Sequence, residues 1–389
     1  MTQSADRSED GAIRSLRRRL PWLLLGVAFV LIAAGCASVT KPQGWAGPAL
    51  AGDTLYVSIE RGKMAALNQD GMSVKWVFPP DTSEGKKLDL EGIYGSPVVT
   101  ADTIYFGAYD GNVYALSTQD GSQRWGPFET GGPIVSGVAA RAAGAAQTID
   151  RLFVGSEDGR VYALDPNNKG AVVHTFDAGD PVWATPLVTE SAVYVATVGG
   201  RLFALDPETL DPLWAAPFKA DAALLTDPVL ADKNTVLVGG IGKQLYAVDA
   251  SDGSEKWSFK AGSWFWGRPL VDGGIVYVPN LDHKVYALNV ADGSNAWQQP
   301  FQAEASVRSS PLLAGSVLLI VDRHGNVSGL DPRTGKSVWS GPSILAKAVL
   351  SDPLLLPDTP AEVLIVAEGG DLFTVDPQAG STRLVEVPG

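Results

Sequence analysis

The sequence contains few of the residues that metal, haem and redox sites require. Its 389 residues include one cysteine and three histidines. One cysteine cannot form an intrachain disulfide, and it excludes motifs that need two or more cysteines, such as those of c-type haem. The histidines, His174, His283 and His324, are widely separated in the chain. We therefore expect no shared metal site.

Basic side chains are also scarce. Lysine and arginine number 30 against 43 acidic residues, which gives a net charge of −13. Nucleic-acid binding depends on clustered basic residues that contact phosphates, so we expect no nucleic-acid partner. Hydrophobic residues make up 45% of the chain. This fraction is typical of a folded protein with a large core and excludes global disorder.

The N-terminal segment has the pattern of an export signal. Residues 1–19 are polar and end in three arginines, and an apolar run of 16 residues follows, from Leu20 to Gly35. A membrane-spanning helix needs about 20 apolar residues, whereas a shorter run is typical of a signal peptide. Basic residues before such a run stay in the cytoplasm, so the rest of the chain is expected to be exported.

The apolar run ends in Ala33-Ala34-Gly35-Cys36, which resembles the bacterial lipoprotein box. The resemblance implies cleavage before Cys36 and lipidation of its thiol, palmitate included. We therefore expect a lipoprotein signal peptide over residues 1–35, a lipidated tether over 36–44, and a membrane anchor on the extracytoplasmic side. Ala37 implies the outer membrane where the cell has one. The alternatives are an ordinary cleaved signal or an uncut anchor, with Cys36 incidental.

Residues 45–389 consist of one unit repeated eight times. The pattern Ala-x-Asp-x-x-x-Gly-x-x-x-Trp recurs, for example as AVDASDGSEKW at 247–257, and a second landmark, usually proline, recurs every 41 to 49 residues. Each unit holds four short apolar runs punctuated by turn signals such as Asp110-Gly111. Repeats of this kind are typical of radially closed sheets. The sequence predicts an all-β fold, an eight-bladed β-propeller of four-stranded antiparallel blades.

The eleven-residue pattern resembles the tryptophan-docking motif of the PQQ-type, or quinoprotein-like, propeller family. In that family the tryptophan of one blade packs on the glycine-containing stretch of the next. The resemblance implies this structural role for six residues: Trp76, Trp125, Trp214, Trp257, Trp297 and Trp339. Val173 and Leu384 occupy the tryptophan position in the third and eighth blades. We expect the contacts of these two blades to be the weakest.

Propellers with this repeat fall into two functional classes. The quinone-dependent dehydrogenases bind Ca²⁺ through carboxylate and amide groups, use a catalytic aspartate and often carry adjacent cysteines. This chain has no cysteine pair, so we expect no enzyme activity, no catalytic residue, no cofactor and no metal. The other class is non-catalytic and includes the BamB-type outer-membrane assembly lipoproteins. The chain resembles them in length, lipoprotein box and blade number, which implies a protein-binding scaffold at a membrane surface, with an envelope protein such as the β-barrel assembly machine as its partner.

One column of residues, three positions before each second landmark, is a candidate binding surface. It alternates with an apolar core column and should therefore face one mouth of the central channel. The column comprises Trp45, Tyr94, Val135, Trp183, Leu225, Trp266, Arg308 and Leu350. Asp227, Arg268 and Asp352 lie one position before the landmark and should line the channel.

Aromatic residues and arginine are enriched in interface hot spots. The residues expected to contact a partner or ligand are Trp45, Tyr94, Trp183, Trp266, Arg268 and Arg308. Two alternatives stay open at this stage. The rings could only plug the channel, or the mouth could bind a small molecule or a glycan.

Two insertions lengthen loops of the repeat. Residues from Pro79 to Glu91 separate the first and second blades, and residues from Arg141 to Asp150 lie inside the third. Loops carry function more often than the scaffold that holds them. The second insertion is rich in alanine and glycine, so it is either functional or simple padding.

Overall fold

The computed structural model describes residues 44–59, 62–80, 88–143, 148–357 and 361–385, and each structural statement concerns these residues. They belong to one compact unit, Gln43–Gly389. The signal peptide expected over residues 1–35, Cys36 and all but the last residue of the 36–44 tether lie outside the described residues.

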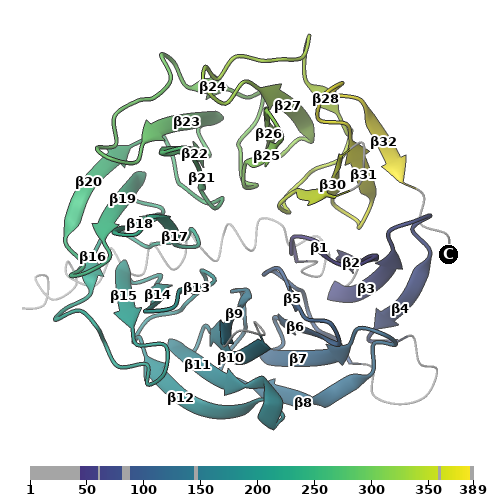
Figure 1. The fold of residues 1–389 in the computed structure, drawn as a ribbon, viewed down its shortest axis with the longest axis vertical. Coiled ribbons are helices and arrows are strands. Elements are labelled where there is room, and N and C mark those ends of the chain that lie inside the picture. The colour runs from purple at the N-terminus through teal and green to yellow at the C-terminus, as the bar shows by residue number, and fades with distance from the viewer. Residues whose placement is uncertain (1–43, 60–61, 81–87, 144–147, 358–360, 386–389) are drawn as a thin grey trace, which may run out of the picture. The chain divides into compact units, whose positions relative to one another are not determined.

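Eight four-stranded antiparallel sheets are arranged in a ring (Figure 1). Every sheet is made from four consecutive strands that pair in sequence order, so each blade is a simple meander. The last blade is built only from C-terminal strands and the first only from N-terminal strands, so no strand crosses from one blade to another. The prediction of an all-β propeller with eight four-stranded blades is confirmed.

The strands follow the predicted repeats. Blades one and two contain β1 (Ala49–Ala51), β2 (Thr54–Ile59), β3 (Lys63–Asn68), β4 (Val74–Phe78), β5 (Val98–Val99), β6 (Thr103–Gly107), β7 (Asn112–Ser117) and β8 (Gln123–Glu129). Blades three and four contain β9 (Val138–Ala143), β10 (Thr148–Gly155), β11 (Arg160–Asp165), β12 (Ala171–Asp177), β13 (Leu187–Val188), β14 (Val193–Ala196), β15 (Arg201–Leu205) and β16 (Phe218–Lys219). Blades five and six contain β17 (Val229–Asp232), β18 (Thr235–Gly239), β19 (Gln244–Asp249), β20 (Glu255–Lys260), β21 (Leu270–Asp272), β22 (Ile275–Pro279), β23 (Lys284–Asn289) and β24 (Phe301–Gln302). Blades seven and eight contain β25 (Leu312–Ala314), β26 (Val317–Val321), β27 (Asn326–Leu330), β28 (Ser343–Ile344), β29 (Leu354–Leu356), β30 (Glu362–Val366), β31 (Leu372–Val375) and β32 (Thr382–Val385).

Helical structure is almost absent from the part of the chain that the structure describes. The helix that lies wholly within the described residues is a short 3₁₀ turn, η2 (Pro166–Asn168). Among those same residues, no helix is long and apolar enough to span a membrane.

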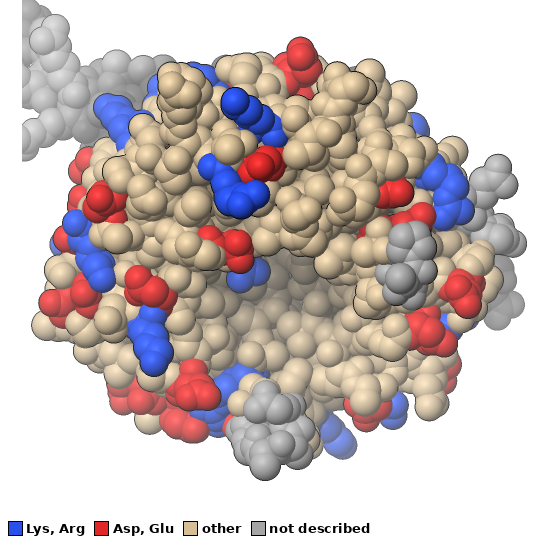
Figure 2. All heavy atoms as spheres, turned by 45° about the horizontal axis from the view of Figure 1, so that its top comes forward, with Lys and Arg blue, Asp and Glu red and all other residues tan. Residues whose placement is uncertain are grey.

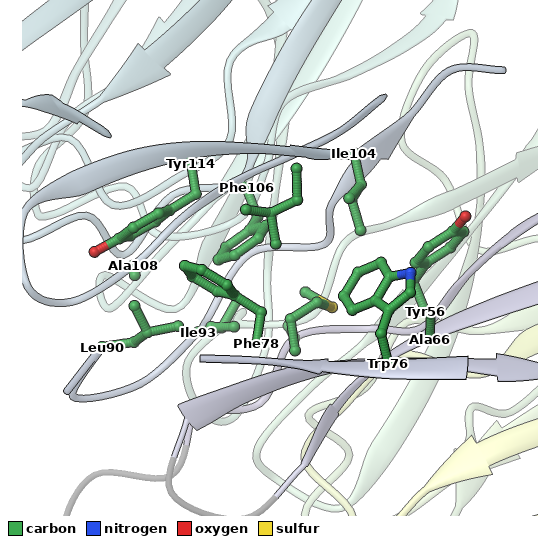
Figure 3. Close-up of a cluster of buried hydrophobic side chains, with 13 residues drawn as sticks. Tyr56, Ala66, Trp76, Phe78, Leu90, Ile93, Ile104, Phe106, Ala108 and Tyr114 are labelled. Atoms are coloured by element: carbon green, nitrogen blue, oxygen red, sulfur yellow. The ribbon is translucent and has the colours of Figure 1, made fainter. Parts of the chain in front are cut away.

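The core lies between neighbouring blades, not within a single central volume. The two middle strands of a blade, such as β6 and β7, are buried almost throughout, because one neighbouring blade covers each of their two faces. Figure 3 shows one such interface, where Trp76 and Phe78 of the first blade pack against Ile104, Phe106 and Tyr114 of the second. Each blade therefore depends on both neighbours for its stability.

The docking tryptophans lie across these interfaces. The Trp76 ring packs so closely on Gly121 of the next blade that a Cβ there would be 2.7 Å from the ring, and Gly121 has a φ of +69°. Its indole Nε1 donates a hydrogen bond to the Thr118 carbonyl at 3.0 Å. The other five tryptophans pack in the same way on a glycine of the following blade: Trp125 on Gly170, Trp214 on Gly253, Trp257 on Gly293, Trp297 on Gly335 and Trp339 on Gly380.

Two interfaces have no docking tryptophan and are packed differently. Leu210 in blade four and Met72 in blade one stand at the repeat's glycine position, with φ values of +60° and +52°. Both are buried, Leu210 in the apolar cluster between blades three and four and Met72 in the cluster that closes the ring between blades eight and one. Val173 and Leu384, which the sequence pattern places at the tryptophan position, are 38% and 55% exposed. The strand register instead puts His174 opposite Ala163 and Arg383 opposite Thr374, where other blades pair the motif alanine with tryptophan. A large side chain from the following blade thus fills the space that the tryptophan fills elsewhere.

The insertion in the third blade extends the β9–β10 hairpin and contacts the fourth blade. The Arg141 guanidinium donates to both carboxylate oxygens of Asp150, at 3.1 and 2.5 Å, and to Glu208 of the next blade at 2.7 Å. Arg151 lies 3.6 Å from the second Glu208 oxygen. This ionic network spans the interface between blades three and four, which lacks a tryptophan. The described part of the insertion is therefore a brace.

The insertion between the first two blades also contributes to the core. Leu90 is 1% exposed and belongs to the cluster between blades one and two. Its carbonyl accepts a hydrogen bond from the Asp110 amide at 3.2 Å. The C-terminal end of this insertion is therefore packed onto the scaffold.

Candidate binding site in the central channel

The inner ends of all eight blades surround a cavity of about 300 Å³. The hollow at the centre of the ring is visible in the space-filling view (Figure 2). The first wall-forming set, which we call the aromatic collar, contains one residue from each blade: Trp45, Tyr94, Val135, Trp183, Leu225, Trp266, Arg308 and Leu350. The structure thus brings together every member of the sequence column, from positions spread over most of the chain.

A second set of wall residues, the polar collar, comes two positions later in the same segments. It consists of Gly47, Ser96, Thr185, Asp227, Arg268, Ser310 and Asp352. Two residues of extended chain span roughly 6.6 Å. The two collars therefore lie at different depths, one mainly aromatic and one mainly polar.

Hydrogen bonds between blades hold the polar collar in place. The Thr185 amide donates to Asp227 Oδ1 at 2.6 Å, and the Ser310 amide donates to Asp352 Oδ1 at 2.7 Å. The Arg268 amide donates to the Ser310 hydroxyl at 3.2 Å. In each case the backbone of one blade is bound by the collar side chain of the next. These contacts give the two aspartates a structural role.

Burial changes the proton affinity of the two aspartates. It raises the pKa of Asp227 to about 6, against the opposing effects of the Thr185 hydrogen bond and the Arg268 charge. Burial also raises the pKa of Asp352, against the opposing hydrogen bonds from Ser310. A carboxyl group with a pKa near 6 changes its protonation state close to neutral pH. The charge of the polar collar therefore depends on pH.

The aromatic collar is organised around Arg308. Its guanidinium carbon lies 4.2 Å from the Trp45 ring centroid and 4.0 Å from that of Trp266, so the cation contacts both indoles, whose rings meet edge to face at 69°. Tyr94 meets Trp45 edge to face at 4.3 Å and Tyr109 at 5.4 Å. Cation–ring contacts and edge-to-face rings are favourable arrangements for these groups.

The electrostatic environment of Arg308 is unusual for an arginine. Burial, together with the nearby charge of Arg323, lowers its pKa to about 10. The side chain is still protonated at neutral pH. Its Nε is buried without a hydrogen bond, and no ion pair joins it to any acidic residue in the described ranges. The burial of Tyr94 raises the pKa of its phenol to about 12.

The remaining sequence candidates take different places. Trp183 lines the same cavity from the fourth blade, and Arg268 is exposed in the polar collar. The three histidines lie in three different blades and are not brought together. In the described part of the chain, no group of three or more His, Cys, Asp or Glu side chains could hold a metal ion. No sequence pattern points to Tyr109, because its contact with Tyr94 depends on how the turn after β6 is placed.

Comparison with known proteins identifies the family. A family model described as outer membrane protein assembly factor BamB matches residues 36–168, 131–227 and 213–386. The chain belongs to this family. The match spans nearly the whole propeller, which confirms the resemblance to BamB-type, PQQ-type propellers found in the docking motif.

Two solved structures share the fold of this BamB-family chain. The crystal structure of BamB from Moraxella catarrhalis is 17% identical, covers 75% of this chain and 86% of its own, and gives a TM-score of 0.61. The computationally designed Ika8 protein is 13% identical, covers 87% of this chain and 97% of its own, and gives a TM-score of 0.68. No curated protein matches the sequence. Identities this low show a shared fold, and a fold alone does not assign a chemistry.

Proposed function

We propose that this protein is a non-catalytic, lipid-anchored scaffold of the cell envelope that binds a protein partner during assembly of outer-membrane β-barrel proteins. The observation that carries the proposal is the BamB family match over nearly the entire propeller. The lipoprotein-box resemblance at Ala33 to Cys36 supports an anchor on the extracytoplasmic side. Where the cell has an outer membrane, we propose that the lipid anchor lies in that membrane.

The mouth of the channel is the proposed partner site. Trp45, Trp183, Trp266 and Arg308 line a single cavity, and these are the residue types that dominate interface hot spots. Binding hot spots are concave and surrounded by other residues that exclude water. A protruding side chain of the partner would enter this cavity and contact its aromatic wall.

Capture from native membranes tests this proposal. The full-length protein, cross-linked and purified from its own membranes, should recover an outer-membrane assembly protein in stoichiometric amount. The Trp183→Ala/Trp266→Ala variant should lose that partner because two rings of the wall are removed. The Trp264→Ala variant is the matched control, since Trp264 belongs to the same segment as Trp266 but does not line the cavity. Equal recovery by all three proteins would place the partner elsewhere on the ring.

The cavity also favours a second candidate function, a binding module for a small molecule or glycan. Its volume of about 300 Å³ lies at the lower end of the range for ligand pockets. Such a module should give saturable changes in tryptophan fluorescence with a small molecule, and no stoichiometric protein should be captured. A dehydrogenase, the least supported alternative, should reduce an artificial dye when quinone and Ca²⁺ are added.

A further inference from the structure

Arg308 carries a charge that nothing in the described wall of the cavity neutralises. Trp45 and Trp266 both lie against its guanidinium, with centroid distances of 4.2 and 4.0 Å, and their rings are at 69° to each other. Its Nε is buried and makes no hydrogen bond. The ionisable groups that act on it most are Arg323, a second cation, and Tyr94, whose phenol stays protonated at neutral pH.

The two indoles give the guanidinium no hydrogen-bond acceptor. Its donors lie in the plane of the group, and the indole nitrogen can only donate. A buried cation without acceptors is unfavourable unless something pairs with it. A carboxylate matches the donors of a guanidinium best, because its two oxygens accept two parallel N–H bonds.

We infer that the aromatic collar is a binding site for a carboxylate, held by the N–H donors of the Arg308 guanidinium beside Trp45 and Trp266. The apolar body of the ligand would lie against the rest of the collar, where Tyr94, Trp183 and Leu225 provide apolar surface. This carboxylate site lies in the channel mouth that we propose as the partner site. It depends on the proposed function only if the carboxylate belongs to the protein partner.

The polar collar restricts which carboxylates fit. Asp227 and Asp352 lie roughly 6.6 Å further along the channel wall, by the two-residue spacing of an extended strand. Ionised, the two aspartates outnumber the single cation of that collar, Arg268, and would repel a second carboxylate at that depth. The cavity volume of about 300 Å³ limits the bound portion to a small group. The site therefore favours a monocarboxylate with a flat, apolar body over a dicarboxylate.

Titration of the purified full chain in a mild detergent tests the inference, with tryptophan fluorescence as the readout and benzoate as the probe. Benzoate should give a saturable change, and benzamide, the neutral isostere, should bind at least about tenfold more weakly because it cannot pair with the guanidinium charge. The Arg308→Gln variant should lose the preference for benzoate. The Arg333→Gln variant, at a side chain 87% exposed on the outer part of blade seven, should keep it.

Thermal denaturation of the same proteins separates binding from folding. Arg308→Gln removes a partly buried, unpaired charge and also its contacts with two indoles, so its melting temperature should stay close to that of the native protein. Benzoate should raise the melting temperature of the native protein and leave that of Arg308→Gln unchanged. The inference is overturned if benzoate on the order of 10 mM has no effect on the native protein, or if Arg308→Gln binds it equally well.

A pair of short peptides, one with a free C-terminal carboxylate and one with a C-terminal amide, identifies the source of the carboxylate. Preference for the free acid over the amide, lost in Arg308→Gln, indicates a peptide terminus, whereas binding of benzoate alone indicates a small metabolite-sized acid. Both outcomes support the carboxylate site. The test uses purified protein only, so its failure leaves the membrane-capture result intact, and failure of capture leaves the titration interpretable.

Discussion

At the scale of single residues, the repeat is maintained by paired substitutions. Six interfaces use a tryptophan against a glycine, and the two interfaces without tryptophan have Leu210 or Met72 in place of the glycine. These are the interfaces that the sequence pattern predicts to be weakest. Both replacements are buried in the inter-blade clusters. At these two interfaces the large side chain therefore comes from the following blade, whereas elsewhere the preceding blade provides a tryptophan.

The reciprocal packing predicts the stability of variants between blades three and four. Leu210→Gly should lower the free energy of unfolding by about 2–3 kcal/mol, because the lost burial outweighs the relief of a positive φ. Adding His174→Trp should restore most of that loss, because His174 pairs with Ala163 as the docking tryptophans pair with their alanines. Urea unfolding measures both, with Leu213→Gly, at a side chain 47% exposed, as control. The account of this interface is wrong if Leu210→Gly is as stable as the native protein.

The buried aspartate of the polar collar predicts a pH dependence. The folded-state pKa of Asp227, about 6, lies above the unfolded value, so the folded protein binds the proton more tightly and this residue's contribution to stability rises as pH falls from about 7 to 4. Asp227→Asn keeps the acceptor for the Thr185 amide but carries no charge. The variant should be more stable than the native protein at pH 7.5.

The difference in unfolding free energy between Asp227→Asn and the native protein should narrow by about 2 kcal/mol when the pH is lowered from 7.5 to 4.5, because native Asp227 is then neutral as well. Chemical denaturation at the two pH values gives the comparison. A difference that stays constant with pH would show that Asp227 has an ordinary pKa in the folded protein.

At the scale of elements, the described part of the β9–β10 hairpin braces one interface through charge. Arg141 is 11% exposed and pairs with Asp150 in its own hairpin and with Glu208 in the next blade. The hydrogen bond from Arg141 lowers the pKa of Asp150. The stabilisation from this pair is therefore complete above the unfolded pKa of an aspartate and is lost as pH falls through the lowered folded value.

Removal of the brace should destabilise the ring moderately. Arg141→Gln should cost about 1–2 kcal/mol at pH 7, less than a fully buried pair because Glu208 is 63% exposed. The matched control is Arg383→Gln, whose pair with Glu362 is largely exposed and should contribute little. Thermal unfolding of both variants at pH 7 and pH 3 checks the prediction. Equal effects of the two substitutions would contradict a bracing role for the hairpin.

At this scale the sequence predicts much of the architecture. Blade number, strand order and the turn at Asp110-Gly111 follow from local signals, because hairpin chemistry and strand periodicity are encoded within a few residues. The brace could not be predicted, since Arg141 and Glu208 are far apart in sequence and only the blade arrangement brings them together. The contacts of Arg308 with Trp45 and Trp266 could not be predicted either. The column of residues is readable, but which members touch depends on side-chain placement across the ring.

At the scale of the whole molecule, the ring closes without a shared sheet. Blades eight and one meet through an apolar cluster that includes Met72, Leu364 and Val366. Closure leaves the inner ends of all eight blades facing one cavity, so residues from Trp45 to Asp352 form a single wall. The described residues thus form a concave, aromatic site at the axis of the ring, and we propose that the partner binds there.

The most direct test of this assignment is site-specific photo-cross-linking in living cells. A photoreactive amino acid is placed at Leu225 or Leu350 in the aromatic collar, or at Val338, which is 50% exposed on the outer part of blade seven. The account predicts that both collar positions form adducts with an outer-membrane assembly protein and that position 338 does not. Adducts with that protein from position 338 alone would show that the partner binds the outside of the ring and would contradict the account.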